Sequence, residues 1–230
     1  MMWLLAIDTI GSVGSVALLE DGALRIETRF AHHHRVSGAV LAAVEFITGQ
    51  VDITLKEIDV YAVDCGPGFF TGVKIGVEIA KTLAHVHNKP MVGIGSLEAL
   101  AYGTHLKQDS LLISVLPARK GEVYYQLFTQ KGTLAPPQVA EVSELAQRVA
   151  ARTESTHLFV GEGCHLYRDL FANDVGEIDI LPARFPSAEA VAMLAHKIVL
   201  SGKTQSAFDL LPNYIKPPSI SIPKRAYTTL

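Results

Sequence analysis

The sequence predicts an α/β protein with two lobes, each containing a mixed β-sheet covered by helices. Over the first hundred residues, three strands follow one another and strands then alternate with helices, which is typical of a mixed sheet with helical cover rather than a helical bundle or a pure sandwich. A second strand pair begins near Leu111 and resembles the first. We therefore expect an N-terminal lobe over residues 1–105 and a smaller, degenerate second lobe over residues 106–230.

The N-terminal lobe is expected to open with three antiparallel strands. Asp21-Gly22 is a strong signal for a two-residue hairpin turn, and apolar runs flank it on both sides. Further on, Thr54 and Glu57 form a capping box, and Asn88-Lys89-Pro90 ends a long helix. The expected elements are strands at Trp3–Thr9, Gly14–Leu19, Ala23–Phe30, Val60–Cys65 and Met91–Ile94, and helices at Val36–Ile47, Thr71–His87 and from Ser96.

The second lobe is expected to begin with a hairpin, Leu111–Leu116 and Glu122–Thr129, whose turn lies around Arg119-Lys120-Gly121. The proline-containing tail Leu211–Pro223 should be extended and lie over the body of the protein. The remaining expected elements are a helix at Ser143–Ala151, a strand at Leu158–Val160 and a helix at Ser187–Leu200.

Composition favours a globular cytoplasmic protein with apolar surfaces that meet a partner. Hydrophobic residues make up 49% of the chain and charged residues 19%. The apolar start is interrupted by Asp8 and has no basic leader, so we expect neither a signal peptide nor a membrane span. The formal charge of −3 gives no general attraction for phosphate backbones, so in an RNA reaction another protein would hold the RNA.

Neither a metal site nor a catalytic set is expected. Cys65 and Cys164 are far apart and have no metal-ligand spacing. His32-His33-His34 are consecutive, so their side chains point in different directions and do not converge on one ion. The chain also contains no HExxH and no GxSxG.

The candidate cofactor-binding residues are Asp8, Thr9, Gly66 and Gly68. Asp8-Thr9 ends the first strand, where an actin-like ATPase would present a carboxylate and a hydroxyl to phosphate and Mg²⁺. The glycines lie between a strand and a helix, where backbone amides can hold an anion. Alternatively, Asp8 satisfies turn amides and the glycines only allow a tight turn. No second acidic partner for Asp8 is recognisable.

Two helices have more apolar surface than one sheet face can cover. The helix from Val36 is apolar almost all round, and the helix from Thr71 has an apolar arc of roughly 200° opposite Lys74, Glu78, Lys81 and His85. Cover by the second lobe is one explanation, and association with another subunit is the other. The predicted partner interface is Val36, Ala39, Val40, Ala43, Val44, Ile47, Gly72, Val73, Ile75, Gly76, Ile79, Ala80 and Leu83.

Several segments resemble the bacterial TsaB (YeaZ) family. They are Leu5–Thr9, Gly66–Gly76, Ala118–Tyr124 and Pro212–Tyr214, with the strongest resemblance from Val60 to Leu97. Pro117 and Val36-Ser37 depart from the family pattern, so no polar role is transferred to those positions.

This resemblance implies an actin/sugar-kinase-like fold (ASKHA, ribonuclease H-like) that has lost independent catalysis. It also implies a partner subunit of the bacterial tRNA threonylcarbamoyladenosine synthase, which pairs with the catalytic subunit TsaD and the ATPase TsaE. That complex transfers a threonylcarbamoyl group to the adenosine beside the anticodon. The family places both the TsaD contact and a homodimer on the first two helices. The resemblance further implies that the isolated chain binds no cofactor, and that ATP with Mg²⁺ would bind only in the assembled complex.

Two enzymatic alternatives stay open on the sequence alone. The first is an ATP-dependent kinase or ATPase that uses Asp8 and the glycine loop. The second is an endopeptidase, which is favoured less because no metal set or nucleophile set accompanies it.

Overall fold

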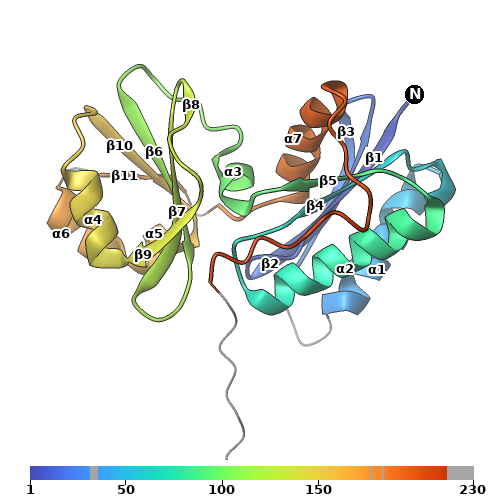
Figure 1. Cartoon of the computed structure of the whole chain (residues 1–230), viewed down its shortest axis with the longest axis horizontal. Helices are drawn as coiled ribbons and strands as arrows, with labels where there is room; N and C mark the ends of the chain where they lie inside the picture. Colours follow the sequence, from blue (N-terminus) through green and yellow to red (C-terminus); the bar gives the residue numbers. More distant parts are fainter. Residues whose placement is uncertain (32–35, 177, 183, 217–230) are drawn as a thin grey trace, which may run out of the picture.

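The computed structural model describes residues 1–31, 36–176, 178–182 and 184–216. It shows two lobes, each built on a mixed β-sheet with helices packed against it (Figure 1). The predicted fold class is therefore confirmed.

The first sheet has the strand order β3-β2-β1-β4-β5. Strand β1 is antiparallel to β2 and parallel to β4, so the meander and the alternating part of the sequence meet at β1. Asp21 and Gly22 both have positive φ and form the predicted turn. The strands are β1 (Trp3–Asp8), β2 (Val13–Glu20), β3 (Ala23–Ala31), β4 (Val60–Asp64) and β5 (Met91–Ile94).

Helices cover both faces of this sheet because its strands are apolar on both sides. Leu5 and Ile7 point to the face covered by α1 and α2, whereas Leu4 and Ala6 point to the face covered by α7. Helix α3 contacts strands of the second sheet. The helices of this lobe are α1 (Val36–Gln50), the 3₁₀ turn η1 (Leu55–Glu57), α2 (Phe70–His87), α3 (Ser96–Ala101) and α7 (Ala188–Leu200).

The second sheet repeats the arrangement of the first. Strand β6 is antiparallel to β7 and parallel to β10, which confirms the predicted hairpin. The strand order is β11-β10-β6-β7-β8, and β9 pairs with β7. The elements are β6 (Ser110–Pro117), β7 (Glu122–Thr129), β8 (Gly132–Thr133), β9 (Gln138–Glu141), α4 (Val142–Ala150), β10 (Thr156–Val160), α5 (Glu162–Leu166), α6 (Arg168–Val175) and β11 (Asp179–Ile180).

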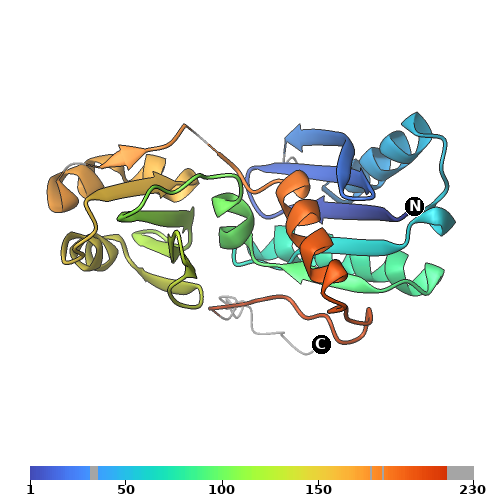
Figure 2. The same cartoon turned by 90° about the horizontal axis from the view of Figure 1, so that it is seen from above.

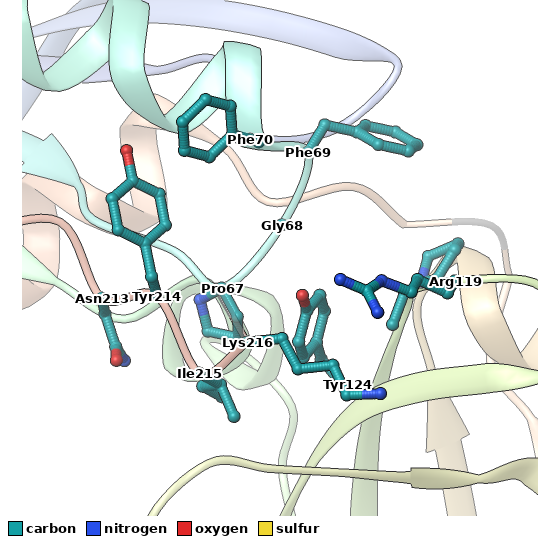
Figure 3. Close-up of a pocket in the computed structure, with 12 residues that line it drawn as sticks. Pro67, Gly68, Phe69, Phe70, Arg119, Tyr124, Asn213, Tyr214, Ile215 and Lys216 are labelled. Carbon is teal, nitrogen blue, oxygen red and sulfur yellow. The ribbon is translucent and has the colours of Figure 1, made fainter. Parts of the chain in front are cut away.

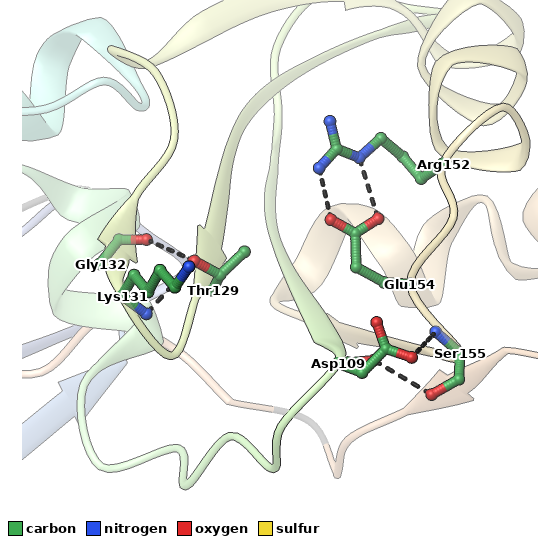
Figure 4. A network of polar contacts seen from close by, with 7 residues as sticks. All are labelled: Asp109, Thr129, Lys131, Gly132, Arg152, Glu154 and Ser155. Atoms are coloured by element: carbon green, nitrogen blue, oxygen red, sulfur yellow. Dashed lines mark hydrogen bonds and ion pairs between the residues drawn. The ribbon is translucent and has the colours of Figure 1, made fainter.

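A polar network fastens the outer end of the second sheet (Figure 4). The Ser155 amide donates to an Asp109 carboxylate oxygen at 3.2 Å, and the Ser155 hydroxyl donates to the Asp109 carbonyl at 3.1 Å. Close by, Arg152 and Glu154 form a two-bonded ion pair. These bonds hold the connection between α4 and β10 beside the start of β6.

The expected second lobe over residues 106–230 has to be corrected at its C-terminal end. Helix α7 packs on β1, β2, β4 and β5 of the first sheet, and Figure 2 shows it lying across that sheet. The physical reason is the second apolar face of the first sheet, which Ala188, Val191 and Ala195 cover.

Residues 205–216, which we call the C-terminal segment, run back along the first lobe. Met91 and Gln205 exchange two backbone hydrogen bonds of 2.8 and 2.9 Å. The Lys81 ammonium donates to the Leu210 carbonyl at 3.0 Å, and the Asn213 amide donates to the Cys65 carbonyl at 2.7 Å. The segment therefore lies over the body as expected, and the rest of the predicted tail is outside the described residues.

Candidate functional site

Asp8 and Thr9 lie at the carboxyl end of β1 and are buried. One Asp8 carboxylate oxygen accepts the Ile10 amide at 3.0 Å. The Thr9 hydroxyl donates to the Gly72 carbonyl at 2.7 Å, at the start of α2. Gly76 permits this approach, because a Cβ there would lie 2.3 Å from the Thr9 hydroxyl oxygen. Thr9 therefore fastens α2 to the first sheet.

Asp8 has an acidic neighbour, Asp64, and the expectation that no second carboxylate accompanies it was wrong. Strands β1 and β4 are parallel and in register, with Ile7 opposite Val63, so Asp8 and Asp64 end adjacent strands. Asp64 is also buried and accepts the Gly66 amide at 2.9 Å and the Ser96 hydroxyl at 2.6 Å. The available signal was an Asp at the end of each of two apolar strands.

Burial decides the protonation of this pair. Desolvation raises the pKa of Asp8 to about 7, and the charges of Glu27 and Glu162 add to that rise, whereas the Ile10 amide and Arg29 oppose it. Desolvation and then the charge of Asp8 raise the pKa of Asp64 well above its usual range, although Ser96 and Gly66 oppose this. The two carboxyl groups therefore do not readily carry a negative charge at the same time.

Gly66 and Gly68 are explained by local packing. Gly66 has φ +96°, a conformation that residues with side chains rarely adopt. A Cβ on Gly68 would lie 1.9 Å from the Cγ2 methyl of Ile10. The loop between β4 and α2 thus fits tightly against the turn after β1.

A pocket of about 280 Å³ lies beside this loop, where segments from both lobes meet (Figure 3). Phe70 stacks on Tyr214 with ring centroids 5.1 Å apart, and Arg119 and Tyr124 face them from the second lobe. Lys216, which also lines the pocket, forms an ion pair with Glu122 at 2.5 Å. Three segments that carry the family resemblance, Gly66–Gly76, Ala118–Tyr124 and Pro212–Tyr214, therefore all contribute to one pocket.

Helix α1 is buried on only one side, so its surplus apolar surface is not covered by the described part of the second lobe. Val40, Val44 and Ile47 are buried against the sheet. On the opposite side, Leu41 and Phe46 keep 50% and 52% of their surface exposed, and Ala42 is exposed as well. The helix therefore presents apolar side chains outward.

Helix α2 shows the predicted polar side, with Lys74, Glu78 and His85 exposed. The C-terminal segment contacts this side, since Phe208 packs edge-on against His85. Ile75, Ile79 and Leu83 are half-buried on the other flank and Val86 is exposed. We call the outward apolar residues of the two helices the α1–α2 patch: Leu41, Ala42, Phe46, Ile75, Ile79, Leu83 and Val86.

Much of the predicted partner interface is core and is corrected here. The reason is helical geometry, because a side chain that points at the sheet cannot also point outward. Val40, Ala43, Val44, Ile47, Gly72, Val73, Gly76 and Ala80 are buried, and Val36, Ala39, Ile75, Ile79 and Leu83 are half-buried. The exposed Leu41, Phe46 and Val86 were missed, although Ala42 and Phe46 have the i, i+4 spacing that places two side chains on one face of α1.

The described residues contain no group of three or more His, Cys, Asp and Glu side chains that could hold a metal ion. His32, His33 and His34 lie outside the described residues. Cys65 and Cys164 are buried free thiols, and burial raises the pKa of each to about 12. None of the described helices is both long and apolar enough to cross a membrane.

Comparison with known proteins identifies the family. The model of the TsaD family, tRNA N6-adenosine threonylcarbamoyltransferase, matches residues 28–223. The tRNA threonylcarbamoyladenosine biosynthesis protein TsaB of Bacillus subtilis is 29% identical, and its alignment covers 94% of each chain. TsaB of Escherichia coli is 28% identical over 94% of this chain and 95% of its own. The chain belongs to the TsaD family, in its TsaB branch.

Solved structures agree with this TsaB assignment. YeaZ from Pseudomonas aeruginosa superposes with a TM-score of 0.78 at 26% identity, covering 93% of this chain and 100% of its own. The activator of 2-hydroxyisocaproyl-CoA dehydratase from Clostridium difficile, solved with bound ADPNP, gives a TM-score of 0.51 at 10% identity over 87% of this chain and 97% of its own. The second likeness shows the shared fold alone.

Proposed function

We propose that this TsaB-family chain is a non-catalytic subunit of the bacterial tRNA threonylcarbamoyladenosine synthase and works in the cytoplasm. It pairs with a TsaD-type catalytic subunit, and a TsaE-type ATPase joins the pair. The observation that carries the proposal is the α1–α2 patch on a chain of the TsaB branch. Soluble proteins rarely expose a large contiguous apolar patch unless another surface covers it, and Leu41, Phe46 and Val86 of these two helices are all exposed.

The α1–α2 patch is the docking surface in this proposal. It packs against helices of the TsaD-type subunit, and against the same patch of a second copy when the chain is alone. Val36, Ala39, Ile75, Ile79 and Leu83 then line the rim of the contact, and the buried residues of the earlier prediction support it from beneath. Covering the exposed half of Phe46 contributes about 1 kcal/mol.

In the assembled complex, tRNA is held mainly by the other subunits. ATP and Mg²⁺ bind only there, and Asp8, Thr9, Gly66 and Gly68 need not contact them. Asp8 and Thr9 are buried and bond within their own lobe, which supports a structural role for both.

Phe46→Glu tests the docking surface, because it places a charge on the outward face of α1 within the patch. We expect at least a tenfold loss of affinity for a TsaD-type subunit, since an unpaired charge buried at an interface costs ~2 kcal/mol or more. Co-purification and titration calorimetry measure it. The matched control is Leu200→Glu, an exposed apolar residue on α7, which should pair normally.

Thermal unfolding of both variants should match that of the wild type, because both side chains already face water. If Phe46→Glu and Leu200→Glu pair equally well with the TsaD-type subunit, the docking surface lies elsewhere. A tenfold loss for both variants would also count against a specific patch.

The second candidate function is an ATP-dependent kinase or ATPase, and the carboxyl pair Asp8–Asp64 at the ends of adjacent parallel strands is the feature in its favour. Tight Mg-ATP binding with turnover by the isolated chain, measured by calorimetry and phosphate release, would favour this enzyme over a subunit. An endopeptidase is favoured least, because the described residues contain no group of three or more His, Cys, Asp and Glu side chains that could hold a catalytic metal ion.

A further inference from the structure

The buried ends of β1 and β4 leave two carboxylate oxygens without partners. Asp8 and Asp64 each use one oxygen, Oδ1, to accept hydrogen bonds from the chain. The other oxygen of each, Oδ2, is buried and has no hydrogen-bond partner among the described residues. A buried polar atom without a partner costs free energy, so two such atoms on adjacent strand ends require an explanation.

The charges around the pair do not supply a counterion. Glu27 of β3 and Glu162 of α5 act on Asp8 with the same sign, and Arg29 of β3 is the cation that opposes them. Arg29 is itself paired with Glu27 at 2.8 Å. On the α2 side, Lys81 acts on Cys65 beside Asp64 and donates to the Leu210 carbonyl. Negative charge therefore prevails around both carboxyl groups.

We propose that Asp8 and Asp64 share one proton and that this proton holds the loop Gly66–Phe70 closed. A hydrogen bond from one Oδ2 to the other satisfies both orphan oxygens at once, and it removes one of two like charges from a buried site. A divalent cation is a poorer occupant, because it takes about six oxygen ligands and the two carboxyl groups leave only one unpartnered oxygen each.

The pair is mechanically connected to the loop. Asp64 accepts from both Gly66 and Ser96, and the Ser96 amide donates to the Gly66 carbonyl at 3.1 Å. On the Asp8 side, Ile10 fills the space against Gly68. Loss of the shared proton leaves two like charges in contact, so the two turns are pushed apart and the loop opens. This loop forms one wall of the pocket and starts α2.

Infrared spectroscopy in D₂O tests the shared proton directly, because a protonated carboxyl group has its own C=O band. Near about pH 6, where ordinary Asp and Glu are ionised, we expect one such band in the wild type. The double variant Asp8→Asn/Asp64→Asn should lose it, each single variant should shift its frequency because the remaining acid no longer bonds to a carboxylate, and Asp174→Asn, an exposed control, should leave it unchanged. Absence of the band in the wild type, its persistence in the double variant, or an unshifted band in both single variants overturns the proposal.

Hydrogen exchange tests the connection to the loop. Protection of the amides in residues 66–72, corrected for intrinsic exchange, should fall roughly tenfold between about pH 6 and pH 9 in the wild type, since one unit of pKa coupling corresponds to tenfold. Asp64→Asn keeps the Oδ1 acceptor and removes the charge, so its protection should not change with pH. An equal fall in wild type and Asp64→Asn overturns the connection.

A substitute variant and a magnesium titration complete the test of the shared proton. If Asp64→Asn does not fold, Asp8→Asn serves in the same exchange experiment with the same expected result. If millimolar MgCl₂ removes the acid band of the wild type at about pH 6, the pair is a cation site, and the shared proton is overturned. These measurements do not involve a TsaD-type subunit, so their failure is separate from failure of the proposed function.

Discussion

At the scale of single residues, glycines set how closely the loops of the first lobe approach one another. Gly68 is required because the Ile10 side chain occupies the position of its missing Cβ, and Gly76 because the Thr9 hydroxyl does. Gly38 is different, since nothing lies within 4 Å of a Cβ built there. The same residue type is thus essential at one position and replaceable at another.

Gly68→Ala should destabilise the protein by ~1–3 kcal/mol, because an extra methyl group overpacks a buried contact. Gly38→Ala on α1 should instead be neutral or stabilise by about 0.5 kcal/mol, since alanine restricts the unfolded chain more than glycine does. Urea unfolding of the two variants measures this difference. Equal stability of both would contradict the packing seen at Gly68.

At the scale of elements, the decisive feature is which apolar side chains each helix packs on the sheet and which it leaves facing outward. Helix α1 places Val40, Val44 and Ile47 on the sheet and turns Leu41 and Phe46 outward. In the C-terminal segment, two consecutive leucines differ in the same way, one buried and one exposed. Leu210 is buried against the first lobe, and Leu211 keeps 73% of its surface exposed.

Leu210→Ala should therefore cost ~2–5 kcal/mol, because it leaves a cavity over the first lobe. Leu211→Ala should change the free energy of unfolding by no more than about 0.5 kcal/mol. Chemical denaturation measures the free energy of unfolding of both variants, which carry the same substitution at neighbouring positions. A small effect at Leu210 would mean that the C-terminal segment contributes little to the stability of the lobe.

At the scale of the whole molecule, the two lobes are joined by a shared apolar cluster, in which α3 packs on β6 and β7, and by polar contacts around it. The Ser12 hydroxyl donates to Glu162 at 2.7 Å, and Arg184 donates to the Tyr102 carbonyl at 3.1 Å. The pocket in Figure 3 lies at this junction and receives aromatic residues from three distant segments. Net charge is the other global property, and at −3 it opposes binding to a polyanion.

The isolated chain should therefore bind tRNA no more tightly than about 10 μM at ~0.15 M salt, because it has no excess of cations to release counterions. Gel-shift and filter-binding titrations with a tRNA transcript measure this, and the assembled complex is the positive control. Submicromolar, salt-dependent binding by the isolated chain would contradict a subunit that reaches tRNA only through its partners.

Much of the fold follows from local signals in the sequence. Asp21-Gly22, the capping box at Thr54 and the repeated hairpin place most strands and helices correctly, because turn chemistry and hydrophobic periodicity act over a few residues. The glycine loop and the tail were also located from sequence. The short α5 and α6 were missed, since one or two turns of helix give too little periodicity to recognise.

The surplus of apolar surface on α1 and α2 could be recognised from the chain alone, since composition along a helix does not depend on its neighbours. Which of those side chains remain outside depends on how α1 and α2 are rotated on the sheet, and that rotation is set by packing. The place of α7 on the first sheet and the position of Asp64 beside Asp8 likewise become visible only in the folded molecule. Both depend on contacts between residues far apart in the chain, and no local pattern encodes such contacts.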